Sequence, residues 1–180
     1  ENAILRLVRS TVSGNLATVD TSSVYGGGLY NEGTAVIARS RITGNRADAA
    51  SAFGGAIYHG GGTMTITETT IAANVATGTG NVEAGGIESD GVLVIRRSLI
   101  AGNTATAGTG IGGGITANTG GSLEITDSTI TGNRARRGGG IDVGTLTGFT
   151  VRGSTIARNT ATDQAGGGIA GNPPIAAIGT

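Results

Sequence analysis

The feature that most constrains this chain is a motif that recurs six times at intervals of 26–30 residues. Each copy has an asparagine, with a hydroxyl residue five positions before it, an aliphatic residue three before it and an alanine two after it. The asparagines are Asn15, Asn45, Asn74, Asn103, Asn133 and Asn159. Self-similarity at a fixed period of this length is the signature of a repeat architecture. The motif therefore predicts a solenoid.

Each unit contains three short segments with the pattern of a strand. The first alternates apolar and mixed residues, as in Leu93–Ile95, which is typical of a strand with one buried face. The second carries the Ser-x-Ile-x-x-Asn sequence, and the third opens with glycines and an aliphatic residue, as in Gly54–Ile57. Between the second and third lies a segment of variable length, longest at 16–25 and 75–83, which we expect to be a surface loop.

The pattern predicts an all-β chain of about six coils with three strands per coil and helix content close to nil. The coil boundaries fall at roughly 4–34, 35–63, 64–92, 93–122, 123–148 and 149–174. We expect residues 1–180 to be one solenoid segment, either a window of a longer protein or a subunit that associates with itself by end-to-end coil stacking.

Stacking at the strand spacing of ~4.8 Å places each position directly above its copy in the neighbouring coil. An inward asparagine in every coil could then donate its amide to the asparagines above and below, as amide ladders do in stacked strands. Buried amides are tolerated only when they are hydrogen-bonded. The six asparagines are therefore predicted to form a structural ladder. The recurring glycines are expected where the backbone takes a positive φ or where coils approach closely.

The composition excludes several classes of function. Twelve basic residues, all arginine, balance twelve acidic residues, so neither nucleic acid nor an anionic membrane surface is an expected partner. No apolar run approaches 18 residues, which argues against membrane insertion by these residues. Cysteine is absent, so disulfides and thiolate metal sites are ruled out. We predict no cofactor and no metal.

Two tetrapeptides in the repeat resemble a known family. Gly54–Ile57 reads Gly-Gly-Ala-Ile, and the Ile-x-x-Asn sequence recurs as in Ile42–Asn45. This pair is similar to the Gly-Gly-Ala-aliphatic and Phe-x-x-Asn tetrapeptides of β-helix repeats in bacterial surface proteins, in particular the polymorphic outer-membrane-protein type. Here isoleucine or valine stands in place of the phenylalanine. The resemblance implies a right-handed, single-stranded parallel β-helix of pectin-lyase-like architecture, secreted to the outside or surface of a bacterium.

The most site-like residues follow the aliphatic residue of the third strand. In successive copies these residues are Tyr30, Tyr58, Glu88, Thr116, Asp142 and Ala170, and Asp90 lies two positions beyond Glu88. Stacked tyrosines beside carboxylates suit weak contact with a glycan, and two carboxylates could form an acid–base pair. The alternative is a solvated strand face without function. The single histidine, His59, has only Asn31 and Ser89 at the equivalent positions of its neighbours, and these are poor partners for catalysis or metal binding.

The expected function is that of an extracellular structural or adhesive segment, a rigid rod that displays variable loops to a host receptor or glycan, without enzymatic activity. The resemblance also allows a polysaccharide lyase or glycoside hydrolase, because β-helices host such enzymes. Those enzymes gather Asp, Arg, Lys or His from adjacent coils, whereas this chain has no lysine and no repeated aspartate. A filament of stacked subunits is a further alternative, and ice binding is disfavoured because outward threonines alternate with arginine and leucine.

Overall fold

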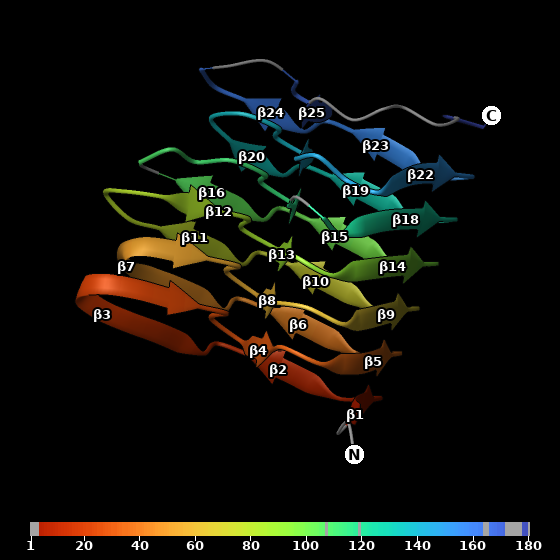
Figure 1. The fold of residues 1–180 in the computed structure, drawn as a ribbon, viewed down its shortest axis with the longest axis horizontal. Coiled ribbons are helices and arrows are strands. Elements are labelled where there is room, and N and C mark those ends of the chain that lie inside the picture. Colours follow the sequence, from red (N-terminus) through yellow and green to blue (C-terminus); the bar gives the residue numbers. More distant parts are fainter. Residues whose placement is uncertain (1–3, 107, 119, 164–165, 172–177, 180) are drawn as a thin grey trace.

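The computed structural model describes residues 4–106, 108–118, 120–163, 166–171 and 178–179. These residues form an all-β solenoid of about six coils, in which each strand pairs in parallel with a strand of a neighbouring coil (Figure 1). The prediction of a parallel β-helix is therefore confirmed. No helix in the described part of the chain is long and apolar enough to cross a membrane.

Two sheets contain the first and second strands of the coils. The first sheet consists of β1 (Ile4–Val8), β5 (Thr34–Ala38), β9 (Thr63–Thr67), β14 (Val92–Arg96), β18 (Ser122–Thr126), β22 (Gly148–Arg152) and β26 (Ile178–Gly179). The second sheet consists of β2 (Thr11–Ser13), β6 (Arg41–Thr43), β10 (Thr70–Ala72), β15 (Leu99–Ala101), β19 (Thr129–Thr131) and β23 (Thr155–Ala157).

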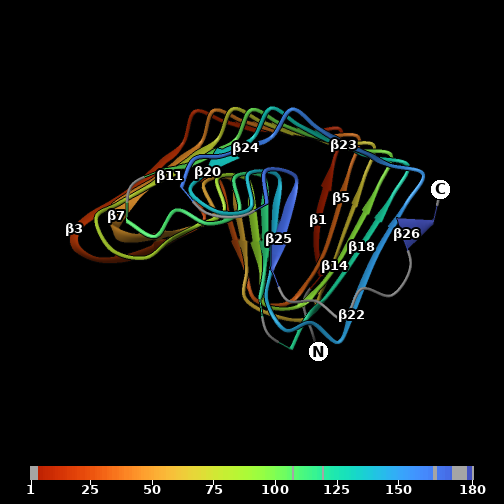
Figure 2. The same ribbon diagram turned by 90° about the horizontal axis from the view of Figure 1, so that it is seen from above.

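Two further sheets complete each coil. The third consists of β3 (Leu16–Tyr25), β7 (Arg46–Phe53), β11 (Val75–Thr77), β12 (Val82–Glu83), β16 (Thr104–Thr106), β20 (Arg134–Ala135) and β24 (Thr160–Ala161). The fourth consists of β4 (Leu29–Asn31), β8 (Ile57–His59), β13 (Ile87–Ser89), β17 (Ile115–Ala117), β21 (Ile141–Val143) and β25 (Ile169–Gly171). Seen along the stack, the fourth sheet lies between the first and the third (Figure 2).

The third sheet corrects the expectation of three strands per coil. The segment after each asparagine was expected to be a loop, but its longest example, 16–25, is strand β3, which pairs with β7 along most of its length. Parallel pairing satisfies the backbone N–H and C=O groups of the segment, and its threonines and valines favour extended structure. The variable length appears instead as a shift of register between Val19 and Ser23.

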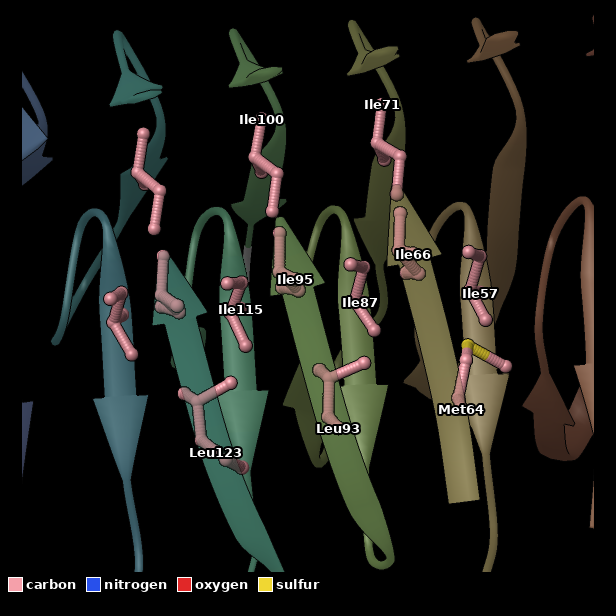
Figure 3. Close-up of a cluster of buried hydrophobic side chains, with 14 of the residues drawn as sticks. Ile57, Met64, Ile66, Ile71, Ile87, Leu93, Ile95, Ile100, Ile115 and Leu123 are labelled. Carbon is pink, nitrogen blue, oxygen red and sulfur yellow. The ribbon is translucent and has the colours of Figure 1, made fainter. Parts of the chain in front are cut away.

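The interior of the stack is filled by columns of aliphatic side chains. In the second sheet Ile42, Ile71 and Ile100 are in direct register, and all three are fully buried. The same stacking repeats in the first and fourth sheets, where the labelled isoleucines and leucines lie one behind another along the rod (Figure 3). Inside the third sheet a separate cluster contains the repeated alanines, including Ala47 and Ala76, together with Val82.

Glycines form the corner between the third and fourth sheets. Gly54 has a φ of 68°, in the left-handed region that glycine adopts without steric cost. A Cβ at the next position, Gly55, would lie 2.4 Å from the carbonyl oxygen of Gly85 in the following coil. The turn thus favours glycine at the first position, where Ala84 adopts a φ of 51° in the third coil, and the close approach of neighbouring coils requires it at the second.

A second corner, between the first and second sheets, takes the left-handed conformation without glycine. Arg39, Glu68 and Arg97 have φ values of 51°, 50° and 47°. Their side chains point to solvent, and Arg97 forms an ion pair of 3.0 Å with Glu68 in the coil before it. Non-glycine residues rarely adopt this conformation, so the corner stores backbone strain in successive coils.

Candidate ligand-binding face

Two rows of side chains face each other between the third and fourth sheets. The third-sheet row contains Tyr25, Phe53, Glu83, Ile111 and Arg137, which pair in register from coil to coil. The fourth-sheet row contains Tyr30, Tyr58, Glu88, Thr116 and Asp142. Each member of the first row lies five residues before its counterpart in the second, across the glycine corner. We call these two sets the facing rows.

Aromatic rings occupy the first two coils of the facing rows. Tyr25 stacks on Phe53 with ring centroids 5.0 Å apart, and Tyr30 stacks on Tyr58 at 5.6 Å. Tyr25 also contacts the edge of Tyr58 at 4.8 Å, which joins the two stacks. Tyr25 and Tyr30 are 43% and 50% exposed. The hydroxyl of Tyr30 donates a hydrogen bond to Glu32, which raises the pKa of the phenol.

Carboxylates occupy the third coil. Oxygens of Glu83, Glu88 and Asp90 lie 3.1, 3.1 and 3.0 Å from one atom, the side-chain Nδ2 of Asn118. The second carboxylate oxygen of Asp90 accepts a hydrogen bond of 2.8 Å from the hydroxyl of Tyr58. An amide nitrogen carries only two hydrogens, so Asn118 cannot give a full hydrogen bond to all three carboxylates.

Glu88 is the most perturbed of these acids. It is only 3% exposed, and its Oε2 has no hydrogen-bond partner among the described residues. Burial raises the pKa of Glu88 well above its usual range, and the charges of Glu83 and Asp90 raise it further, against the opposing hydrogen bond from Asn118. Glu88 can therefore hold a proton at a higher pH than an exposed glutamate does.

An ion pair closes the facing rows in the fifth coil. The guanidinium of Arg137 donates two hydrogen bonds of 2.6 Å to the carboxylate of Asp142, which is 2% exposed. The same pairing raises the pKa of Arg137. This bidentate geometry compensates the buried charge of Asp142. The positive charge of Arg137 is therefore paired with the carboxylate of Asp142 in the fifth coil.

His59 lies on the other side of its strand from Tyr58, facing the interior. It is fully buried, its Nδ1 is 3.1 Å from the amide nitrogen of Asn31, and its Nε2 has no partner in the described part of the chain. Burial lowers the pKa of this imidazole, which favours the neutral form. Across the described residues, no group of three or more His, Cys, Asp or Glu side chains is arranged to hold a metal ion.

The six asparagines of the repeat lie in one column at the end of the second sheet. The backbone N and Nδ2 of Asn74 both donate to the Oδ1 of Asn103, at 3.0 and 2.9 Å, and its Nδ2 also donates to the carbonyl of Ile42. The same donation runs from each asparagine to the next in the order Asn15, Asn45, Asn74, Asn103, Asn133 and Asn159. The serines and threonines five residues before these asparagines form a second column, the hydroxyl column, with the same direction of donation. For example, the backbone N of Ser40 donates to Thr69 Oγ1 at 3.2 Å.

The structure brings Tyr30, Tyr58, Glu88 and Asp90 together on one face, as the sequence pattern suggested. Sequence reasoning missed the opposite row and Asn118, which sits above the carboxylates. A signal for the opposite row was present, because tyrosine and glutamate each recur at a spacing of five residues across the glycines, as in Glu83 and Glu88.

Comparison with known proteins adds no relative to this description. No family model, no curated protein and no solved structure matches the chain. The geometry of the facing rows therefore carries the functional argument.

Proposed function

We propose that this chain is a rigid structural and adhesive segment of a bacterial surface protein, without enzymatic activity, that binds carbohydrate at the aromatic end of the facing rows. The observation that carries the proposal is where the aromatic residues lie. The chain has five in 180 residues, and four of them, Tyr25, Tyr30, Phe53 and Tyr58, form one cluster. The fifth, Phe149, is buried in the core.

The cluster has the chemistry that sugars require. A pyranose has apolar C–H faces that pack on aromatic rings and hydroxyl groups that donate to carboxylates. Tyr25 and Tyr30 expose much of their surface, and Glu32 and Asp90 place acceptors beside Tyr30 and Tyr58. Stability of the rod alone does not require exposed aromatic side chains, because the aliphatic columns already fill the interior.

The rod itself suits display outside the cell. The asparagine and aliphatic columns leave few buried backbone or amide groups without partners, so local opening is costly. A rod that rarely opens resists proteases, which cleave exposed and mobile segments. The bacterial and surface assignments rest on the resemblance of the tetrapeptides.

Binding to an immobilised panel of oligosaccharides tests the proposal. The wild type should retain one or more sugars, and Tyr30→Ala, which removes an exposed ring, should lose that binding. Thr70→Ala, on the outer face of the second sheet, is the matched control and should bind like the wild type. A wild type that retains no sugar, or a Tyr30→Ala variant that binds as well as the wild type, would refute it.

One observation favours a second candidate, a polysaccharide lyase or glycoside hydrolase. Glu88 is a buried carboxyl with a raised pKa, its neighbour Asp90 accepts hydrogen bonds from Tyr58 and Asn118, and a carboxyl that keeps its proton can serve as a general acid. Against this, the carboxyl of Glu88 is buried. Release of reducing ends or unsaturated products from polysaccharides by the wild type, abolished in Glu88→Gln, would replace the non-enzymatic proposal.

A further inference from the structure

The facing rows concentrate negative charge on a chain whose net charge is zero. Glu83 and Asp90 are both partly exposed, and an oxygen of each lies within 3.1 Å of the side-chain Nδ2 of Asn118. The one arginine in the rows, Arg137, is engaged by Asp142. The middle of the face is therefore acidic and lacks a cation of its own.

The same cluster is short of hydrogen-bond donors. Asn118 supplies two N–H groups to three carboxylates, Tyr58 supplies one O–H to Asp90, and the side-chain amide of Asn81 donates to Glu83 Oε1 at 2.8 Å. The Oε2 of Glu88 has no donor among the described residues although it is buried. These four donated hydrogens serve the six oxygens of three carboxylates, so the cluster can accept a further donor, and its charge favours a cationic one.

From these two observations we infer that the ligand of the facing rows is an oligosaccharide with free amino groups, of the glucosamine type. This inference rests on the carbohydrate binding proposed above and specifies the sugar. One sugar ring packs on Tyr25 and Tyr30, and the ammonium group of a neighbouring unit binds the exposed side of the Glu83 and Asp90 carboxylates. The carboxylates repel uronic acids, which are the anionic sugars.

The spacing along the rod sets the size of this ligand. Tyr30 belongs to the first coil and Glu83 to the third, two strand spacings away, which is about 9.6 Å. A single sugar ring cannot contact both, so two or more linked units are needed. Ammonium–carboxylate contacts that remain partly exposed are screened by salt, and the preference for the amine therefore weakens at high ionic strength.

Isothermal titration of the whole chain with four tetrasaccharides tests the inference. The probes are β-1,4-linked glucosamine, its N-acetylated form, β-1,4-linked glucose and α-1,4-linked galacturonate, all at neutral pH and low salt. The glucosamine form should bind at least about tenfold more tightly than the acetylated and glucose forms. Galacturonate should bind most weakly, and salt should reduce only the advantage of the amine.

Two variants locate the amine contact. Asp90→Asn and, independently, Glu83→Gln should abolish the preference, so that the glucosamine and glucose probes bind each variant with equal affinity. Glu124→Gln, an exposed carboxylate of the first sheet, is the control and should keep the preference. Thermal unfolding of each variant verifies that it folds, and Glu83→Gln provides the test if Asp90→Asn does not.

The outcomes separate the two proposals. Equal affinity for the glucosamine and glucose probes overturns the amine inference and leaves carbohydrate binding standing. Preference for galacturonate overturns it as well. Binding of none of the four probes, together with an empty oligosaccharide panel, overturns both.

Discussion

Removing one asparagine from the middle of the ladder should cost far more stability than removing one at its first rung. In Asn103→Ala the Oδ1 that accepts from the backbone N and the Nδ2 of Asn74 is lost. Asn74 is fully buried, so its backbone N–H and one Nδ2 hydrogen are left without partners, while the other Nδ2 hydrogen keeps the carbonyl of Ile42. Each buried, unsatisfied donor costs about 1–3 kcal/mol, and we expect a total loss of ~3–5 kcal/mol in the free energy of unfolding.

The matched control is Asn15→Ala. Asn15 donates to Asn45 Oδ1 at 2.8 Å, but no described residue donates to its own side chain, and it is exposed. Its removal deletes one net hydrogen bond, worth about 0.5–1.5 kcal/mol. For a chain of this size the two variants should lower Tm by roughly 6–20 °C and 1–6 °C respectively.

Two measurements check this difference. Thermal unfolding gives the two Tm shifts, and hydrogen exchange of the Asn74 backbone amide reports the broken contact directly, since that N–H should exchange faster in Asn103→Ala and normally in Asn15→Ala. Equal Tm shifts for the two variants, or an Asn74 amide that stays protected in Asn103→Ala, would refute the reasoning that the ladder is held by amide pairing.

Three other predictions follow from the backbone and from Glu88. Ala73 and the equivalent Gly44 both have a positive φ, 56° and 65°, and a Cβ added at Gly44 would have no atom within 4 Å. Backbone conformation alone therefore separates the two residues, so in denaturant titrations Ala73→Gly should stabilise the chain by ~0.5–1 kcal/mol and Gly44→Ala should destabilise it by the same amount. Gly55→Ala places a methyl group 2.4 Å from the carbonyl of Gly85 and should lower the unfolding free energy by at least ~2 kcal/mol, measured the same way. Burial and neighbouring charges raise the folded-state pKa of Glu88 above its ordinary value of 4.5. Above pH 4.5 the folded protein therefore binds more protons than the unfolded chain, and the free energy of unfolding should fall by up to ~1.4 kcal/mol for each unit by which pH rises. Glu88→Gln should remove this part of the pH dependence, and an unchanged slope in the variant would contradict the prediction.

The sequence predicted the parts of the fold that repeat without change in length. Columns such as Ile42, Ile71 and Ile100 follow from the constant step between copies, because only one stacking register places all of them inside. The strand of the third sheet was missed because its length differs between coils, and variable length is normally typical of a loop. Positive φ at Arg39 and its copies was unpredictable, since nothing in an arginine indicates a left-handed conformation.

The candidate site was half predictable for the same reason. Tyr30, Tyr58 and Glu88 follow an aliphatic residue at a fixed offset, so their shared row could be inferred from the alignment of copies. Glu83 belongs to the segment of variable length and Asn118 to a loop of a different coil, and neither position follows from periodicity. Glu88 is buried beside Glu83 and Asn118, whose positions the repeat does not predict. For this reason the sequence suggested an exposed strand face, whereas the structure shows a covered carboxyl.

The one-way donation along the asparagine and hydroxyl columns gives the rod a chemical polarity. Between asparagines, the backbone N–H and one Nδ2 hydrogen point towards the next coil and the amide oxygen towards the previous one, so the two faces of a coil are complementary and not alike. The other Nδ2 hydrogen, as in Asn74, is held by a carbonyl of the previous coil. Further coils from any chain can continue these columns only if they are added head to tail. A two-fold symmetric junction would place the amide donors of one coil against the amide donors of the other. Because the coils have this single direction, a ligand that spans several of them contacts the aromatic part of the facing rows at one end and the acidic part further along the rod, always in that order.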